Sequence, residues 1–512
     1  MPVPEGDRKP KQRVIPVTSL IHEGVLWEET TNNPRFQFTA RGGIMSDSIE
    51  VGNVKYVPML DDLFAQGVVI LPTHVEPYGT RGELLTSIQQ MIHKYCQVSE
   101  PFERLASYYV MFTWFFDRFE SIPYLRLLGD WGSGKSRSLR VIGAMCYKPM
   151  FANAGASRSA IFHIIDQMRG TLVMDEADFK ENDEHYEIVR MLNCGNNRMT
   201  KYLRAEVVKK KSGTEAYKTK AFDVFGPKVL ASRKLFPDEA LESRCLTERI
   251  ETLTRTDVPI ELPPEFETET EIIRNKLLTH RLDKWMDIRP VTERFMGIEP
   301  RINQIINPII AIFHDDEVIK NDILLFARKL NLILLEQRGT RWEAWVAKAI
   351  YDIKTVRPDT RHISLKEIAD SINESKKLGE DEALSPRRLA GTFKEMGMRK
   401  KQIRARIHVI ISDRMIETFK ARYGVDHMDE DGTITGEDDA SEMAGEILRD
   451  GNKSIDSFEN TNHKKDKEPP EPFDDADSDT ETKAYFQDND PRFKRKDAEG
   501  KESEPRKENG GR

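Results

Sequence analysis

A run of glycines around one lysine is the first feature of this sequence that could do chemistry. Residues 129–136 read Gly-Asp-Trp-Gly-Ser-Gly-Lys-Ser and match the pattern GxxxxGK[ST] in full. Glycines let successive backbone N–H groups turn inward around phosphate oxygens, the lysine reaches the β- and γ-phosphates, and the hydroxyl that follows binds Mg²⁺. The pattern predicts a site for ATP and Mg²⁺, with Lys135 on the phosphates and Ser136 on the metal.

The segments on either side of this loop support the same prediction. Tyr124–Leu128 is an apolar run typical of a strand, and Ser136–Cys146 has the pattern of a helix. A strand, a glycine-rich loop and a helix in this order are the setting that a phosphate-binding loop requires. We interpret Trp131 as a packing residue rather than a base-stacking one. The residues predicted to bind the nucleotide are Gly129, Asp130, Trp131, Gly132, Ser133, Gly134, Lys135, Ser136 and Arg137.

Two adjacent carboxylates follow a second apolar strand. The run Thr171–Met174 ends in Asp175 and Glu176. In nucleoside-triphosphate hydrolysis one carboxylate at such a strand end binds Mg²⁺, and a second residue orients and polarises the attacking water. We therefore assign Asp175 to the metal and Glu176 to the water. Residues 175–178 also spell the DEAD-box motif, but the sequence lacks the second RecA-like domain and the HRxGR-type motif of those helicases.

A third apolar strand, Gly226–Ser232, brings further candidates. A polar residue at the end of such a strand can hydrogen-bond the γ-phosphate or the water, so Ser232 is a candidate sensor; the alternative is an ordinary loop serine. Arg244 lies shortly after it, where a guanidinium can stabilise transition-state charge on a neighbouring subunit's nucleotide. The alternative for Arg244 is a surface salt bridge, and Arg233 and Arg249 are second choices for its role.

The elements that must position these residues follow from periodicity. Strand and helix patterns alternate from Tyr124 to about Ile250, which is typical of an α/β layer with a parallel sheet. Helical patterns cover Gly82–Glu120 and 268–352, the latter interrupted at prolines 290, 300 and 308. Short β-type runs precede them at Arg13–Leu20, Arg35–Thr39, Ile49–Val57 and Gln66–Leu71.

Two basic stretches are candidates for nucleic-acid contact. Residues 198–220 hold eight Lys and Arg and resemble a hairpin that turns near Lys211–Thr214. The second stretch, Arg399–Arg406, follows a helix predicted from Ser385, and together with Ile363–Ile372 and the strand Arg406–Ile411 it indicates a winged helix. The alternatives are a solvated hairpin and a protein-contact module. The residues predicted to touch nucleic acid are Lys209, Lys210, Lys211, Arg387, Arg388, Lys400 and Lys401.

The order of these motifs resembles a superfamily 3-type helicase core and, more narrowly, the helicase-like ATPases associated with phage and plasmid primases. The similarity covers Pro123–Ile250, where Phe222–Lys228 reads FDVFGPK and Asp238–Arg244 reads DEALESR. A weaker similarity is found at Leu384–Arg404. The resemblance implies a P-loop NTPase core of the AAA+/superfamily 3 type in a ring, usually a hexamer, that tracks along DNA with ATP and Mg²⁺. Ser232 replaces the usual Asn of the sensor, and residues 1–120 show no primase metal cluster.

Combined, these patterns predict an α/β fold class with six parts. They are a β-rich N-terminal module (1–78), a helical connector (79–120), a P-loop ATPase core (121–255), a helical region (256–355), a winged-helix-like domain (356–424) and a disordered acidic tail (425–512).

Charge and composition narrow the class of protein. The net charge of the 512 residues is −8, but residues 426–512 carry 27 Asp and Glu against 14 Lys and Arg, a net of −13, so residues 1–425 carry −8 + 13 = +5. A mildly basic body is compatible with nucleic-acid binding. No apolar run is long enough to span a membrane, no secretory signal is visible, and the four cysteines are widely spaced without a CxxC pair. These features predict a cytoplasmic protein without membrane, disulfide or zinc.

The leading hypothesis is an ATP-dependent DNA motor, a ring-forming helicase or translocase of phage, plasmid or integrated-element replication. Its expected partners are DNA, further copies of the chain and, in replication, a primase or related protein. The alternative is an ATPase of the same core that remodels or loads proteins without unwinding DNA. A third possibility, a DNA-binding regulator with a degenerate nucleotide site, is disfavoured because Lys135, Asp175 and Glu176 are all present. The acidic tail is expected to act as a solubilising extension; the alternative is that it occupies basic grooves.

Overall fold

The computed structural model describes residues 12–428, except for 33–34, 154, 178–182, 210–214, 251–254, 340–341, 376–383, 387–388, 390–391, 394–395 and 405. The predicted hairpin turn at Lys211–Thr214 and nearly all of the predicted acidic tail lie outside these residues. Among the described residues, no helix is long and apolar enough to cross a membrane. All four cysteines are free thiols in the structure.

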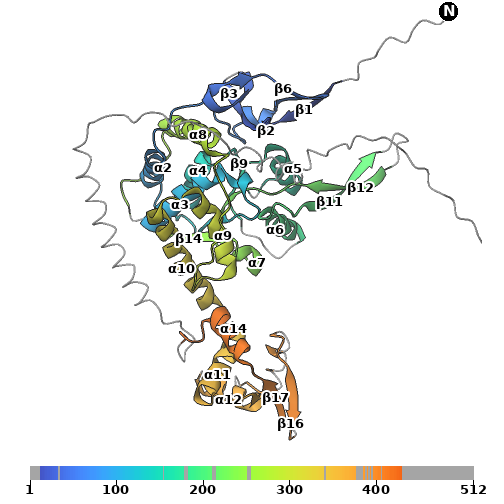
Figure 1. The fold of residues 1–512 in the computed structure, drawn as a ribbon, viewed down its shortest axis with the longest axis vertical. Helices are drawn as coiled ribbons and strands as arrows, with labels where there is room; N and C mark the ends of the chain where they lie inside the picture. Colours follow the sequence, from blue (N-terminus) through green and yellow to red (C-terminus); the bar gives the residue numbers. More distant parts are fainter. Residues whose placement is uncertain are drawn as a thin grey trace, which may run out of the picture. The chain divides into compact units, whose positions relative to one another are not determined.

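A five-stranded parallel sheet forms the centre of the α/β part (Figure 1). It confirms the predicted alternation of strands and helices from residue 124 to residue 250. The strand order is β14-β8-β13-β10-β9, so only β9 and β10 are neighbours both in the chain and in the sheet. Val69, from a run predicted as a strand, forms only an isolated antiparallel bridge with Met150 of β9 at the edge of this sheet. The strands are β8 (Tyr124–Leu128), β9 (Pro149–Ala152), β10 (Thr171–Met174), β13 (Lys228–Ser232) and β14 (Cys245–Arg249).

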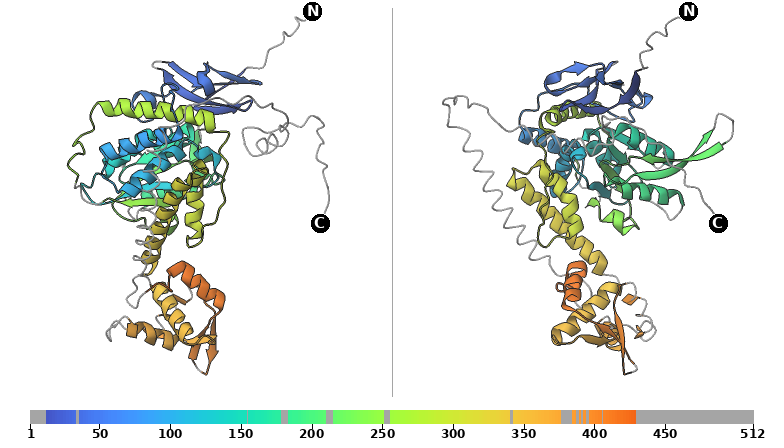
Figure 2. Two further views of the ribbon diagram at one scale, coloured as in Figure 1. Left: turned by 60° about the vertical axis from the view of Figure 1, so that its left-hand side comes forward. Right: turned by 45° about the vertical axis from the view of Figure 1, so that its right-hand side comes forward.

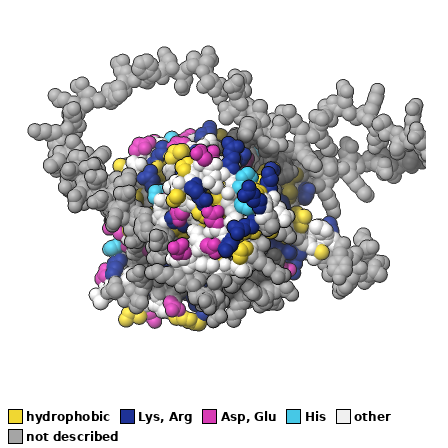
Figure 3. Space-filling view, turned by 90° about the horizontal axis from the view of Figure 1, so that it is seen from below, with side chains coloured by type: hydrophobic (Ala, Val, Ile, Leu, Met, Phe, Trp, Pro, Cys, Tyr) yellow, Lys and Arg dark blue, Asp and Glu magenta, His cyan; other side chains and the backbone are white. Residues whose placement is uncertain are grey.

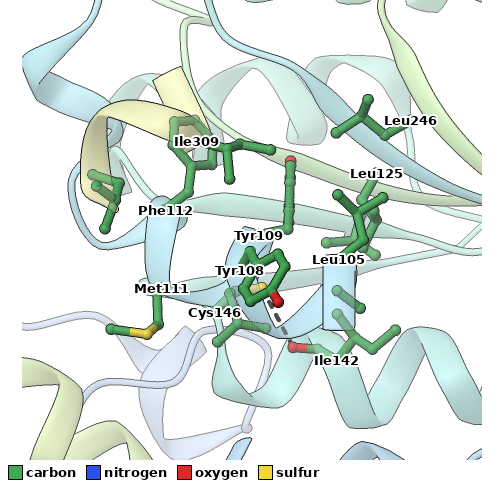
Figure 4. Close-up of a cluster of buried hydrophobic side chains, with 14 of the residues drawn as sticks. Leu105, Tyr108, Tyr109, Met111, Phe112, Leu125, Ile142, Cys146, Leu246 and Ile309 are labelled. Atoms are coloured by element: carbon green, nitrogen blue, oxygen red, sulfur yellow. Dashed lines mark hydrogen bonds between the residues drawn. The ribbon is translucent and has the colours of Figure 1, made fainter. Parts of the chain in front are cut away.

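Helices cover both faces of the sheet because its strands alternate between two apolar cores. In β8, Leu125 and Leu127 face one core, and Tyr124 faces the other. Figure 4 shows the first core, where Leu125 lies near Tyr109, Ile142 and Leu246, residues of two helices and a neighbouring strand. The helices on this side are α2 (Arg81–Tyr95), α3 (Glu100–Thr113), α4 (Lys135–Met145) and α8 (Glu265–Lys284); those on the other are α5 (Arg158–Met168), α6 (Asp183–Gly195) and the short α7 (Glu239–Glu242).

The N-terminal part consists of short strands in two small sheets, of order β1-β7-β6 and β2-β3-β4-β5. Its own apolar core is small, with Leu20, Phe38 and Ile49 buried. Figure 2 shows α8 beside these strands, and Arg41 forms an ion pair of 3.0 Å with Asp283 at the end of that helix. The elements are β1 (Arg13–Val17), β2 (Ser19–His22), β3 (Val25–Asn32), β4 (Arg35–Thr39), β5 (Met45–Ser46), β6 (Ile49–Val51), β7 (Val54–Pro58) and α1 (Asp62–Ala65).

A buried cluster of charges joins the N-terminal strands to the α/β part. Glu28 of β3 accepts hydrogen bonds from Lys148 Nζ at 2.8 Å, Arg281 Nε at 2.8 Å and the Tyr147 hydroxyl at 2.8–2.9 Å. Arg281 of α8 also forms two hydrogen bonds, of 2.7 and 2.9 Å, with Asp117. The side chains of Glu28, Lys148 and Arg281 are each only 1% exposed. Such charges are tolerated in a core because each is paired and hydrogen-bonded.

The neighbouring Glu29 does not add a second negative charge. Burial raises its pKa to about 8, against the opposing charge of Lys148 and a backbone hydrogen bond from Met59. Glu29 is therefore mostly protonated at neutral pH. Of the two glutamates in β3, only Glu28 provides a negative charge for the buried Lys148 and Arg281.

Replacing Glu28 by Ala should destabilise the full chain by about 3–5 kcal/mol, because it leaves two buried cations without their shared partner. The expected result is a clear drop in the thermal unfolding temperature, measured by calorimetry or circular dichroism. Glu23→Ala is the matched control, since the Glu23 side chain is 83% exposed and its loss should change stability by less than about 0.5 kcal/mol. Equal unfolding temperatures for the two variants would contradict this account of the cluster.

Long helices follow the sheet, and one differs from the sequence prediction. We expected Pro308 to interrupt a helix, but α9 runs from Pro300 through Pro308 to Ile312. Pro300 lies in the first turn, where no backbone N–H donor is required. The nonpolar residues around Pro308 are buried in the same core as α3 and α10, so tertiary packing outweighs the lost backbone hydrogen bond. The helices that follow are α10 (Glu317–Gly339) and α11 (Trp342–Val356).

A two-stranded hairpin separates α6 from β13. Its strands are β11 (Tyr202–Lys209) and β12 (Glu215–Phe222), and they pair with each other and not with the central sheet (Figure 2). At the start of β13 the buried amine of Lys228 donates to the carbonyl oxygens of Val224 and Gly226, both at 2.7 Å, and of Gly195 at 3.3 Å. Burial lowers the pKa of Lys228 to about 7.

The C-terminal described part has an apolar core of its own, with Ile363, Phe393 and Val409 fully buried. The segment predicted as one helix from Ile363 begins instead with a short strand and becomes helical at Leu365. The three strands form an antiparallel sheet of order β15-β17-β16. The elements are β15 (His362–Ser364), α12 (Leu365–Ser375), β16 (Lys400–Ile403), β17 (Arg406–Ile410) and α14 (Asp413–Tyr423).

Candidate nucleotide site

The strand order brings the predicted nucleotide residues to one edge of the sheet. The carboxyl ends of parallel strands meet at the same edge, and ligands of open α/β sheets bind there. β8 ends at the phosphate-binding loop, β10 ends at Asp175 and Glu176, and β13, which ends at Ser232, lies between them. Gly129 N donates to the Ser232 carbonyl oxygen at 3.2 Å, and Ala177 N donates to that of Ala231 at 2.8 Å. The three segments are thus joined by backbone contacts.

The phosphate-binding loop requires glycine at three positions, for two reasons. Gly132 and Gly134 have φ angles of 72° and 86°, in the left-handed region that favours glycine. A Cβ atom on Gly129 would lie 2.7 Å from the Ile250 carbonyl oxygen, too close for any side chain. Gly134 caps α4, so the first backbone N–H groups of that helix belong to the end of the loop.

The donors of this loop fit a Mg²⁺–nucleotide. Lys135 Nζ donates to the Asp130 carbonyl oxygen and to Ser133 Oγ, the latter at 3.3 Å, so the ammonium group is held against the loop. Ser136 is exposed in the first turn of α4. Backbone N–H groups, an ammonium and a hydroxyl are the groups that phosphates and Mg²⁺ require here. Within the described residues, no group of three His, Cys, Asp or Glu side chains could hold a metal ion. Ser136 and Asp175 are the residues that would hold Mg²⁺ beside the phosphates.

The two carboxylates after β10 have different surroundings. Asp175 N donates to the Ala152 carbonyl oxygen at 3.1 Å, and Asp175 Oδ1 accepts from Glu176 N at 2.8 Å. Glu176 is exposed and has a φ of 54°, a left-handed conformation that is uncommon for a residue with a side chain. Such backbone strain is frequent at functional sites, where it redirects a side chain.

The side chains of Ser232 and Arg233, at the end of β13, make different contacts. The Ser232 side chain is 1% exposed, and its hydroxyl donates to the Lys234 carbonyl oxygen at 3.1 Å, within the turn. The guanidinium carbon of Arg233 lies 4.3 Å from the ring centroid of Trp131, in the phosphate-binding loop. Trp131 is 77% exposed, so the expectation that it is a packing residue is wrong. Sequence reasoning missed this pair because 102 positions separate its members.

Arg244 lies at the opposite edge of the sheet from the phosphate-binding loop. It directly precedes Cys245, which pairs with Tyr124 at the amino end of β8, whereas the loop follows Leu128. A strand of this length separates the two edges by about 15 Å. Arg244 donates to Asn193 Oδ1 of α6. Any contact of Arg244 with a nucleotide would therefore need a second chain, whereas Arg249, at the carboxyl end of β14, lies on the same edge as the loop.

The Arg137 side chain is directed to a segment that follows the sheet. Its guanidinium donates to the carbonyl oxygens of Pro259 and Ile260. Of the residues predicted to bind the nucleotide, Arg137 thus has a side chain already engaged elsewhere. Sequence reasoning also missed Arg126, which is fully buried in β8 and forms an ion pair with Glu242; a basic residue inside an apolar run was the available signal.

The residues predicted to touch nucleic acid are only partly described. Lys209 ends β11, and Lys400 and Lys401 begin β16. In the hairpin, Arg204 lies directly opposite Lys220, and within the described part of the chain neither forms an ion pair. Lys210, Lys211, Arg387 and Arg388 lie outside the described residues.

Comparison with known proteins gives structural similarities and no family. No protein-family model matches the chain, and no curated protein matches it. Similar solved structures include the apo C-terminal region of NrS-1, with 8% identity over 73% of this chain and 84% of that chain and a TM-score of 0.33. A JCV helicase bound to a small molecule has 13% identity, 47% and 74% coverage and a TM-score of 0.17. The Drosophila ORC bound to DNA has 11% identity, 70% and 97% coverage and a TM-score of 0.17. With scores this low, the functional argument rests on the site.

The geometry predicts different defects for two substitutions. Lys135→Ala should weaken binding of Mg²⁺–ATP, because it removes the phosphate-binding ammonium. Glu176→Gln should leave binding intact and lower hydrolysis about 100-fold or more, because it removes the group that polarises the water. Binding is measured by isothermal titration calorimetry and turnover by phosphate release. Lys284→Ala and Glu261→Gln, both exposed, are the matched controls. A Glu176→Gln variant with normal turnover would remove Glu176 from the mechanism.

Proposed function

We propose that this protein is an ATP-dependent motor on DNA, a ring-forming helicase or translocase of phage, plasmid or integrated-element replication. The observation that carries the proposal is the meeting of the phosphate-binding loop, Asp175–Glu176 and the end of β13 at one edge of a parallel sheet. Lys135 binds the phosphates, Ser136 and Asp175 hold Mg²⁺, and Glu176 activates the attacking water. The proposed setting is the cytoplasm, with a primase or another replication protein as a further partner.

Two surfaces support DNA as the partner of this ATPase. The hairpin carries Arg204, Lys218 and Lys220 on one face, because Arg204 lies opposite Lys220 and Lys218 is two residues before Lys220 in the same strand. Glu206 lies opposite Lys218 in the register, so this face has three basic residues and one acidic residue. In the antiparallel sheet of the C-terminal part, Lys401 and Arg406 make no ion pair within the described residues. Figure 3 shows Lys and Arg side chains gathered on one part of the face it draws. Groups of Lys and Arg side chains suit a phosphate backbone.

Single-stranded DNA should stimulate ATP hydrolysis by the wild-type protein. Substituting Lys209, Lys210 and Lys211 together by Ala should abolish most of that stimulation and lower the salt dependence of DNA binding by about two units of log–log slope, at about 0.7 per lost contact. The control removes three exposed cations, Lys284, Arg328 and Lys329, from the helical region. If DNA does not change the rate of ATP hydrolysis by the wild type, the result would instead favour an ATPase that remodels or loads proteins.

Arg244 should act on the nucleotide of a neighbouring chain, because it lies at the edge away from its own. Arg244→Ala and Lys135→Ala should each be nearly inactive alone, and an equal mixture should regain turnover, since one interface can combine an intact loop with an intact Arg244. A mixture of Lys135→Ala with Glu176→Gln is the control, because those two groups belong to the same site and no interface restores both. Equal turnover in the two mixtures would contradict a shared site.

A further inference from the structure

The end of β13 presents two side chains to the nucleotide edge, and only one of them extends to the phosphate-binding loop. Ser232, the expected sensor, is buried, and its hydroxyl is bonded to the Lys234 carbonyl oxygen. Arg233 reaches across to the loop, where its guanidinium carbon lies 4.3 Å from the Trp131 ring centroid. The serine is therefore occupied by the turn, while the arginine is held at the loop that would bind phosphate.

The position of Arg233 in the sheet places it between the two halves of the site. β13 pairs with β8 on one side and with β10 on the other, and neighbouring strands lie about 4.8 Å apart. The residue after Ser232 is therefore flanked by the loop of Lys135 and by the carboxylates of Asp175 and Glu176. A γ-phosphate bound by the loop and Mg²⁺ would lie in this interval, and a guanidinium offers it two parallel hydrogen bonds.

Trp131 has no packing role that would explain an indole in this loop. The side chain is 77% exposed. Its neighbour Gly132 has a φ of 72°, and a Cβ atom built on Gly132 would have no atom within 4 Å, so the loop around the indole is open. The guanidinium of Arg233 lies over the face of this indole, where a cation is attracted to the ring, and a phosphate group can compete for the same guanidinium.

We infer that Arg233 is the residue of β13 that contacts the γ-phosphate of a nucleotide bound to its own chain, and that Trp131 is a positioning residue that holds the guanidinium beside the loop until the triphosphate binds. This inference rests on the proposed nucleotide site. It assigns to Arg233 the discrimination between ATP and ADP, because only ATP carries the phosphate in question.

The test compares binding of ADP and of a non-hydrolysable ATP analogue, each with Mg²⁺, to the full chain by isothermal titration calorimetry. Arg233→Ala should weaken binding of the analogue at least tenfold and binding of ADP less than about twofold, since a charge-assisted hydrogen bond to phosphate is lost only with the analogue. Lys234→Ala, which removes an adjacent exposed cation, is the matched control and should change neither affinity. Ser232→Ala should also leave the ratio of the two affinities unchanged.

Fluorescence provides a readout that a merely structural role would not alter. Binding of the analogue should change the indole emission of the wild type as the guanidinium leaves the ring. The change should be absent in Trp131→Phe and small with ADP. In Trp131→Phe the phenyl ring retains part of the contact, so analogue affinity should fall less than in Arg233→Ala.

The outcomes separate this inference from the proposed function. If the wild type binds neither nucleotide, the proposed function fails and the inference fails with it. If the wild type binds both and Arg233→Ala keeps the wild-type ratio of affinities, the inference alone is overturned. If Ser232→Ala loses analogue affinity selectively while Arg233→Ala does not, the serine is the sensor and Arg233 has no such role.

Discussion

The ion pairs of Glu28 with Lys148 and Arg281 connect parts of the molecule that lie far apart in the sequence. Glu28 comes from an N-terminal strand, Lys148 from the turn before β9, and Arg281 from α8, where it also binds Asp117 after α3. A buried charge is tolerated only while its partners remain in place. The β-rich part therefore cannot separate from the sheet without exposing uncompensated ions, and the small apolar core of that part does not have to support it alone.

The strand order of the central sheet brings the residues of the candidate nucleotide site together. β8, β10 and β13 are far apart in the chain, but in the sheet β13 lies between β8 and β10. The carboxyl ends of the three strands are therefore next to one another. The three ends bring together the glycine-rich loop, two adjacent carboxylates and Arg233. The same parallel arrangement places Arg244 next to the amino end of β8, at the edge of the sheet away from the phosphate-binding loop.

Local patterns in the sequence predicted the parts of the fold that depend on local chemistry. The phosphate-binding loop, its flanking strand and helix, and the strand before Asp175 follow from residue types at short spacing. Strand order and side-chain partners could not be predicted, because they depend on contacts between residues distant in the chain. Three cases show this: Glu28 and Glu29 are buried within β3, Pro308 lies inside a helix, and Trp131 contacts Arg233.

The amine of Lys228 has a mechanical consequence. It binds three carbonyl oxygens, of Gly195, Val224 and Gly226, and so joins the end of α6 and the segment after the hairpin to the first residue of β13. Five residues lie between Phe222, the last of β12, and Lys228. A force on the base of the hairpin would therefore act on a segment that these hydrogen bonds hold in place. β13 would then transmit the force along its length to the edge of the sheet where the phosphate-binding loop lies.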